Sequence, residues 1–148
     1  MRVIFVTVYS IILFLLCACK RQLSIDEMRE ATHQKCVGRW QLEKSSLQIF
    51  EPYYPTLKSE TVYVGVADDF FHFKQNDSVS IGKAGQPVKE GSVYFNVHQL
   101  ILSYEHDCPY EHGWFIDSLQ PNRMILSWLG RYDDSTLRTR RETLYFTR

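Results

Sequence analysis

The chain has 148 residues, equal numbers of acidic and basic side chains, and no stripe of basic residues. A single domain is therefore expected, and nothing indicates nucleic-acid binding. Tyr, Phe and Trp make up 14 % of the residues, which favours β structure because flat aromatic side chains pack well on a pleated surface.

Residues 1–18 have the pattern of an export signal. A positive start, Met1-Arg2, precedes an apolar run that is shorter than the roughly 20 residues needed to span a membrane. The run ends in Leu16-Cys17-Ala18-Cys19, which resembles a bacterial lipobox. The resemblance implies cleavage before Cys19 and attachment of acyl chains such as palmitate to this residue. The mature protein would then be a lipoprotein anchored in a membrane by its N-terminus.

Two alternatives to the lipid anchor remain open: an ordinary signal peptide cut near Ala18, and a retained membrane helix. If Cys19 is acylated, the residues that follow it decide the membrane. Lys20 stands where some lipoproteins carry a retaining Asp. By resemblance to lipoprotein sorting signals, this implies the bacterial outer membrane.

A short helix is expected over residues 25–35, within a tether that covers residues 19–36. Ser24 and Glu27 have the spacing of a capping box, in which each side chain accepts a hydrogen bond from a free amide at a helix start. The apolar side of this helix, Ile25 and Met28, is small, so weak docking is expected.

From residue 37 onward the chain predicts strands joined by turns. The first strand runs over 38–50, with Trp40 and Leu42 on one face. Residues 59–74 form one bent strand or two, because Ala67-Asp68-Asp69 interrupts them. The remaining strands are expected at 78–83, 90–97, 99–105, 113–119, 123–130 and 136–148.

The expected loops alternate between long and short along the chain. In an up-and-down meander successive loops lie at opposite ends, so all the long loops gather at one end. If residues 59–74 count once, the fold is all-β: an eight-stranded up-and-down antiparallel barrel over residues 37–148, preceded by the short helix. Such a barrel is just wide enough to be filled by side chains or to hold one small ligand.

This barrel resembles the lipocalin-like families. The resemblance depends on Gly38-x-Trp40 at the first strand, on the meander over residues 38–148 and on the final Arg148. In lipocalins an Arg of the last strand packs across the Trp at the closed end. The resemblance therefore implies structural roles for Gly38, Trp40 and Arg148, with a cation–π contact between the last two. The alternative is that Trp40 is an ordinary core residue.

One stretch, 105–112, is crowded with His, Cys and carboxylate side chains, which can be metal ligands or acid–base groups. Their spacing matches no known metal pattern, and the chain has no nucleophile elbow, phosphate loop or HExxH. We therefore assign no metal, no cofactor and no catalytic residue, and expect that the protein is not an enzyme.

Cys36 and Cys108 leave a conflict. Outside the cytoplasm two remaining cysteines usually pair. The eight-strand topology places them at opposite ends of the barrel, about 20 Å apart, whereas a disulfide spans at most about 7 Å between Cα atoms. If residues 59–74 were two separate strands, the two cysteines would lie at the same end. Both possibilities remain open.

The leading hypothesis is a membrane-anchored, non-catalytic protein that binds a small apolar or amphipathic molecule inside the barrel. The alternative is a structural or interaction module of the cell envelope, with a filled barrel and a protein partner. A binder needs a cavity of roughly 300 Å³ or more. The predicted ligand-binding residues are three aromatics near the mouth and three aliphatics one layer below, on adjacent strands: Tyr104, Trp114 and Trp128, then Leu102, Ile116 and Leu126.

Overall fold

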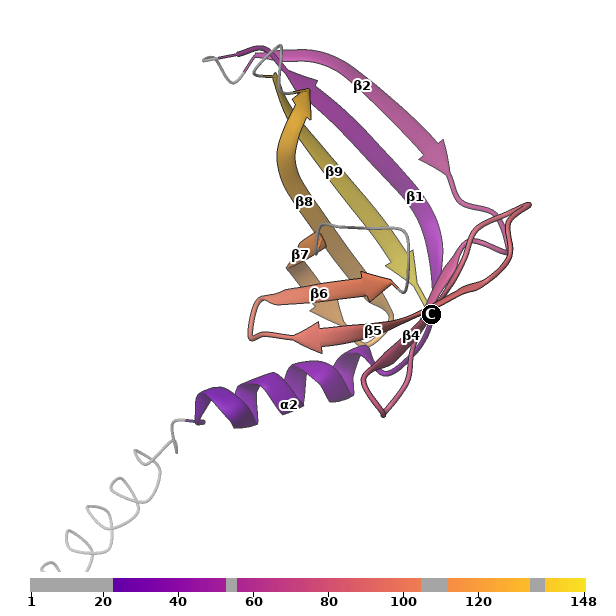
Figure 1. The fold of residues 1–148 in the computed structure, drawn as a ribbon, viewed down its shortest axis with the longest axis vertical. Coiled ribbons are helices and arrows are strands. Elements are labelled where there is room, and N and C mark those ends of the chain that lie inside the picture. Colours follow the sequence, from indigo (N-terminus) through magenta and orange to yellow (C-terminus); the bar gives the residue numbers. More distant parts are fainter. Residues whose placement is uncertain (1–22, 53–55, 105–111, 134–137) are drawn as a thin grey trace, which may run out of the picture.

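The computed structural model describes residues 23–52, 56–104, 112–133 and 138–148. The proposed export signal, Cys19 and most of the reactive stretch 105–112 lie outside these ranges. Within them the chain forms a single helix followed by a sheet that curves into a barrel (Figure 1).

The helix α2 covers Ile25–Cys36. Its capping box is formed as predicted: the Ser24 amide donates to Glu27 Oε2 at 2.8 Å, and the Glu27 amide donates to Ser24 Oγ at 3.2 Å. These two bonds use amides that would otherwise lack acceptors at the helix start. The predicted helix is thus confirmed, and it extends one residue further, to Cys36.

Nine strands follow in the described part of the chain, and all their pairings are antiparallel. They are β1 (Gly38–Phe50), β2 (Leu57–Val64), β3 (Phe70–Phe73), β4 (Ser78–Gly82), β5 (Lys89–Phe95), β6 (Gln99–Tyr104), β7 (His112–Gln120), β8 (Arg123–Asp133) and β9 (Arg138–Thr147). Each strand from β3 to β8 pairs with the next, β9 returns to pair with β1, and β1 also pairs with β2 and β3. The predicted eight-stranded antiparallel barrel is therefore confirmed, with β2 and β3 counted as one interrupted strand.

A bulge in β1 explains why the strand over residues 57–73 is interrupted. The register between β1 and β9 shifts between Leu42 and Lys44, and such an extra residue bends a strand. Before the shift β1 pairs with β3, and after it with β2. Both β2 and β3 run antiparallel to β1, so the interruption does not reverse the chain.

The corner between β2 and β3 lies close against the bend of β1. The Gly65 amide donates to the Glu43 carbonyl at 2.9 Å, and the Leu42 amide donates to the Asp69 carbonyl at 2.8 Å. A Cβ atom at residue 65 would lie 2.0 Å from the Leu42 carbonyl oxygen. This contact requires glycine, so Gly65 allows the corner to approach β1.

The two ends of the barrel differ, as the loop lengths predicted. We call the end with Gly38 and the short turns after β3, β5 and β7 the base, and the opposite end the mouth. Helix α2 lies at the base, and β1, β2, β8 and β9 extend far beyond β5 and β6 as a curved wall (Figure 1). One side of the barrel is therefore much taller than the other.

The core fills the base. Every strand except β2 and β7 contributes at least one buried apolar side chain. The largest fully buried side chains are Trp40, Phe73 and Phe146, and Phe73 packs edge-on against Phe95 with ring centroids 5.8 Å apart. By contrast, every residue of β2 is exposed. The interior is thus filled by aromatic side chains at the base, while β2 contributes only to the upper wall.

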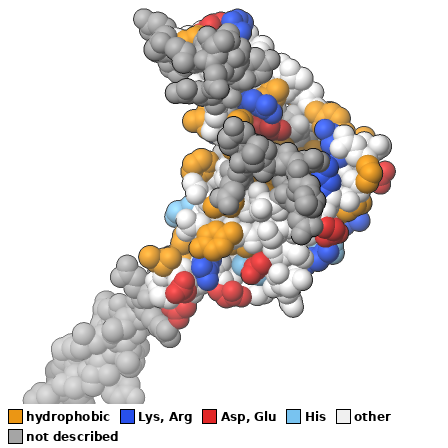
Figure 2. All heavy atoms as spheres, viewed as in Figure 1, with side chains coloured by type: hydrophobic (Ala, Val, Ile, Leu, Met, Phe, Trp, Pro, Cys, Tyr) orange, Lys and Arg blue, Asp and Glu red, His pale blue; other side chains and the backbone are white. Residues whose placement is uncertain are grey.

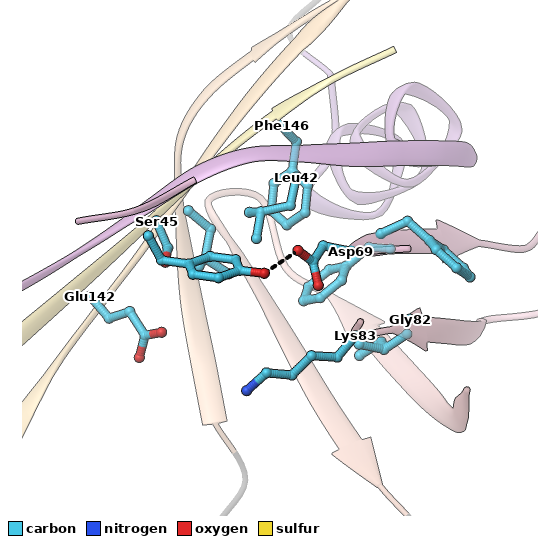
Figure 3. A pocket seen from close by; sticks show the side chains of 12 residues that line it. Leu42, Ser45, Asp69, Gly82, Lys83, Glu142 and Phe146 are labelled. Atoms are coloured by element: carbon cyan, nitrogen blue, oxygen red, sulfur yellow. Dashed lines mark hydrogen bonds between the residues drawn. The ribbon is translucent and has the colours of Figure 1, made fainter. Parts of the chain in front are cut away.

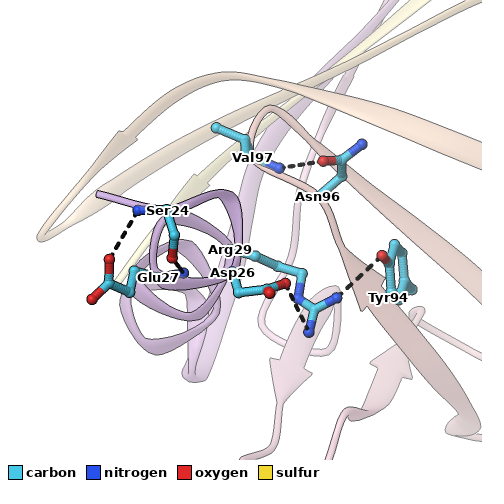
Figure 4. A network of polar contacts seen from close by, with 7 residues as sticks. All are labelled: Ser24, Asp26, Glu27, Arg29, Tyr94, Asn96 and Val97. Carbon is cyan, nitrogen blue, oxygen red and sulfur yellow. Dashed lines mark hydrogen bonds and ion pairs between the residues drawn. The ribbon is translucent and has the colours of Figure 1, made fainter. Parts of the chain in front are cut away.

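Helix α2 docks on the base through residues other than those predicted. Ile25 is 69 % exposed, whereas His33 and Cys36 are buried. The His33 ring stacks on Phe95 with centroids 4.8 Å apart, and Arg29 donates a hydrogen bond of 3.3 Å to the Tyr94 hydroxyl (Figure 4). The helix is held by polar and aromatic contacts, which the small apolar side of its sequence did not indicate.

Cys36 is a free thiol at the base and is completely buried. Burial raises the pKa of this thiol to about 12, although the charge of Arg148 acts in the opposite direction. A thiol with so high a pKa is unreactive at neutral pH. Cys108 lies outside the described residues.

Candidate functional site

The base holds the three residues that the lipocalin-like resemblance singled out. Trp40 is completely buried, and the Arg148 guanidinium carbon lies 4.0 Å from the centroid of its ring. Gly38 has a φ of +122°, and a Cβ atom there would lie 3.4 Å from Arg148 Nη2. The predicted contact between Trp40 and Arg148 is therefore present, and Gly38 provides both the backbone conformation and the space for it.

Arg148 also joins the helix to the barrel. Its Nη2 donates to the carbonyl of Lys35 at 3.0 Å and to that of Val37, both at the end of α2. The last carbonyls of a helix have no partner within it and carry partial negative charge, so a guanidinium there is favourable. The Trp40 indole Nε1 donates to the Cys36 carbonyl at 2.6 Å. The base is thus a structural site in which Arg148 caps the end of helix α2.

The predicted ligand-binding residues lie largely on the predicted inner face. Leu102 and Leu126 are buried in the core, and Trp114 and Ile116 pack against it. Ile116 pairs with Leu126, and Trp114 pairs with Leu100. On the other face Phe115 is 45 % exposed. The structure places Tyr104 in β6, and its side chain is outside the described residues.

Trp128 lies nearer the mouth than the other described residues of this set. It alternates with the buried Met124 and Leu126 on β8 and pairs with Glu142 of β9. The guanidinium carbon of Arg140 is 5.5 Å from its ring centroid. Trp128 is therefore beside a charged segment of β9, and not only in an apolar layer.

A cavity of about 420 Å³ opens above the filled base. Residues from β1, β2, β3, β4 and β9 line it, together with the corner between β2 and β3 (Figure 3). Its floor and walls are mainly apolar, formed by Leu42, Phe71, Ile81, Leu144 and Phe146. Its volume falls in the range typical of small-molecule sites.

A network centred on Asp69 forms the polar side of this cavity. The Asp69 carboxylate accepts hydrogen bonds from the Tyr63 hydroxyl at 2.7 Å and from the amides of Val66 and Ala84 at 2.9 Å each. The residue is only 2 % exposed. Burial alone would raise the pKa of this carboxyl, but the three hydrogen bonds and nearby Lys83 outweigh burial and lower it. Asp69 is thus ionised and joins the β2–β3 corner to the loop after β4.

None of the predicted ligand-binding residues lines this cavity. They lie on β6, β7 and β8, whereas the cavity is bounded by β1, β2, β3, β4 and β9. The two sets are nevertheless in contact through the sheet, because Leu126 pairs with Leu144 and Trp128 pairs with Glu142. The alternation of Leu144 and Phe146 in the sequence predicted that these β9 side chains face inward. No local sequence pattern indicated that a cavity lies beside them.

A second, smaller cavity of about 190 Å³ lies between α2 and the base. Arg29, His33, Asp77 and Tyr94 are among the residues that line it. His33 Nδ1 is 3.4 Å from Asp77 Oδ1, and His33 Nε2 is 3.2 Å from the Lys74 carbonyl oxygen. These contacts hold the helix in place, and the cavity is below the size of most ligand sites.

We next consider charged and hydrophobic patches, metal ligands and membrane-spanning helices in the described ranges. Acidic, basic and hydrophobic side chains are interspersed on the face shown in Figure 2. Among the described residues, no cluster of three or more His, Cys, Asp or Glu side chains could hold a metal ion. The same ranges contain no helix with the length and apolar character needed to cross a membrane.

Comparison with known proteins does not add a relative. No family model matches the chain, and neither a curated protein nor a solved structure is similar enough to count as a match. A function can therefore be inferred only from the barrel, the cavity and the residues around them.

Proposed function

We propose that this barrel binds one small apolar or amphipathic molecule in the cavity bounded by β1, β2, β3, β4 and β9, without catalysing a reaction. The observation that carries the proposal is the cavity volume of about 420 Å³ above an apolar floor. A site of this size can enclose much of a small ligand, and apolar contact is the main source of affinity in such sites.

The polar groups at the cavity support binding over catalysis. The Asp69 carboxylate already accepts three hydrogen bonds, one of them from Tyr63. A carboxylate held this way, with a lowered pKa, is a poor general base. Asp69 and Tyr63 instead fix the shape of the wall.

The alternative proposal, a structural module with a filled barrel, is favoured by the base alone. There the aromatic core leaves Trp40, Phe73 and Phe146 without exposed surface. The cavity above this core exceeds the roughly 300 Å³ expected of a binder. We therefore place the structural module second, with an envelope protein as its partner.

A pair of matched substitutions tests the cavity. Ser45→Phe places a large side chain in the cavity, which Ser45 lines. It should weaken binding of the neutral fluorophore N-phenylnaphthylamine by about tenfold or more, because the ring occupies the ligand's space. Ser103→Phe makes the same change at an exposed position of β6 and should leave binding unchanged. Equal affinities of the wild-type, Ser45→Phe and Ser103→Phe proteins would contradict the proposed site.

We further propose that ligand binding changes the fluorescence of the predicted residues Trp114 and Trp128. Trp128 pairs with Glu142, which lines the cavity, and Trp114 packs against the core. We propose that Leu102, Ile116 and Leu126 support the cavity from the core and do not line it. Leu126 connects the two sides, since it pairs with the cavity residue Leu144.

We also propose that Cys19 anchors the protein to the outer membrane of a bacterium. The support is the Leu16-Cys17-Ala18-Cys19 motif after an apolar run of signal length. Cys19→Ala should move the exported protein from the detergent phase to the aqueous phase in two-phase partitioning, because it removes the acyl chains. Cys17→Ala is the matched control and should stay in the detergent phase. Unchanged partitioning of Cys19→Ala would exclude the anchor.

A further inference from the structure

The inner face of β9 changes in character from base to mouth. Alternate residues of a strand share a face, about 6.6 Å apart. The buried Phe146 and Leu144 begin the series, and Glu142 lines the cavity with them. Arg140 and Arg138 continue the same alternation toward the mouth. A molecule lying along this strand would meet an apolar surface first and two guanidinium groups next.

Arg140 has unused hydrogen-bonding capacity. Its Nη2 donates to Glu142 Oε2 at 2.9 Å, and its guanidinium carbon lies 5.5 Å from the Trp128 ring centroid. Its Nε is buried and has no hydrogen-bond partner among the described residues, and the same is true of Arg138 Nε. A buried donor left without an acceptor is costly. Two arginines on one face of β9 with this defect are placed to donate hydrogen bonds to an acceptor on a bound molecule.

The charges around the cavity favour an anion. Lys83, which directly follows β4, and Glu142 of β9 both line it and extend toward the same open space (Figure 3). Arg138 and Arg140 lie beyond Glu142 on the same face of β9, outside the lining of the cavity. Together with Lys83 they give three cationic groups against the carboxylates of Glu142 and Asp69. The Asp69 carboxylate already accepts three hydrogen bonds. Among the described residues, the net charge at the mouth side of the apolar floor is therefore positive.

We infer that the ligand is an anionic amphiphile, with an apolar chain over Leu144 and Phe146 and an oxyanion head that accepts hydrogen bonds from Arg140. This inference depends on the proposed function, because it assigns a ligand class to the same cavity. A guanidinium binds carboxylate, sulfate and phosphate oxygens with charge-assisted hydrogen bonds. A neutral head would not use the positive charge, and a cationic head would be repelled by it.

The test is displacement of bound N-phenylnaphthylamine by three amphiphiles of equal chain length. Dodecanoate, dodecanol and dodecylamine differ only in the charge of the head group at neutral pH. Dodecanoate should bind about tenfold more tightly than dodecanol, and dodecylamine more weakly than both. Dodecyl sulfate and dodecyl phosphate distinguish a carboxylate head from other oxyanions, and tighter binding of either would still support the assignment of an oxyanion.

Two arginine variants locate the head group. Arg140→Gln should lower the affinity for dodecanoate about tenfold and leave the affinity for dodecanol unchanged. Arg141→Gln is the matched control: Arg141 is the neighbouring residue, pairs with Asp117 at 3.8 Å and lies on the other face of β9. Glu142→Gln should strengthen dodecanoate binding, because it releases Arg140 from its internal partner.

Each outcome has a distinct meaning. Equal affinity for dodecanoate and dodecanol in the wild-type protein would overturn the anionic ligand while leaving the cavity as a binding site. Equal losses in Arg140→Gln and Arg141→Gln would overturn the role of Arg140. If neither N-phenylnaphthylamine nor any of the amphiphiles bound, the proposed function itself would fall. The comparison of amphiphiles uses the wild-type protein, so it holds even if a variant does not fold.

Discussion

Trp40→Ala is expected to lower the free energy of unfolding by about 3–5 kcal/mol, the range for removing a large buried aromatic side chain. Trp40 is completely buried among the apolar side chains of the base. The substitution also removes the hydrogen bond to the Cys36 carbonyl and the ring on which Arg148 stacks. The loss therefore combines a cavity with the removal of one of the contacts that hold helix α2 on the barrel.

Urea unfolding followed by circular dichroism measures this effect. Arg148→Ala is the companion variant and should cost about 1–2 kcal/mol, because it removes the cation–π contact and the hydrogen bonds to the end of α2 but leaves no cavity. Trp40→Phe keeps a ring and should fall between the two. A loss below about 1 kcal/mol in Trp40→Ala would show that Trp40 does not support the core.

Asp69→Ala is the second substitution with a large expected effect, a loss of about 2–4 kcal/mol. It leaves the buried Asp69 site without a carboxylate and removes the acceptor of the Val66 and Ala84 amides. Each buried donor without a partner costs about 1–3 kcal/mol. The substitution also frees the Tyr63 hydroxyl, so the wall of the cavity loses its fixed shape.

The pH dependence separates this role from simple packing. The pKa of Asp69 is lower in the folded protein than in the unfolded chain. Its stabilisation is therefore complete above the unfolded pKa of about 3.9 and is lost as the pH falls through the folded value. The difference in unfolding free energy between wild type and Asp69→Ala should shrink in acid. The exposed neighbour Asp68 provides the control, since Asp68→Ala should show little loss at any pH. A difference that stays constant into acid would contradict an ionised Asp69.

Much of the fold follows from local patterns. The spacing of Ser24 and Glu27 predicts the helix start, because a capping box involves only neighbouring residues. Alternation predicts which side of each strand faces inward, as Trp40 and Leu126 show. The contacts by which α2 docks on the barrel could not be predicted from local sequence patterns. His33 and Arg29 contact Phe95 and Tyr94, which are far away in the sequence.

The predicted ligand-binding residues lie on β6, β7 and β8, whereas the cavity lies on another side of the barrel. The aromatic residues on β6, β7 and β8 were predicted to face the interior near the mouth, and Trp114 does pack against the core. The cavity instead lies beside β2, where the bulge after Leu42 bends β1 and the β2–β3 corner leaves space. A bulge is one extra residue in a ladder, and it becomes visible only when both strands are paired.

The resemblance to the lipocalin-like families implied the contact of Arg148 with Trp40 at the base, whereas the sequence by itself determined the order of the strands and their inner faces. These depend on side-chain periodicity and on loop lengths, which are properties of short segments. Only the tertiary structure decided where the interior is filled and where it is open. That outcome depends on how tall each wall is, on where β1 bends, and on which side chains from strands far apart in sequence meet. The tertiary structure thereby brought Asp69, Lys83 and Glu142 to one cavity. It placed Arg140 just beyond the lining of this cavity, on the same face of β9.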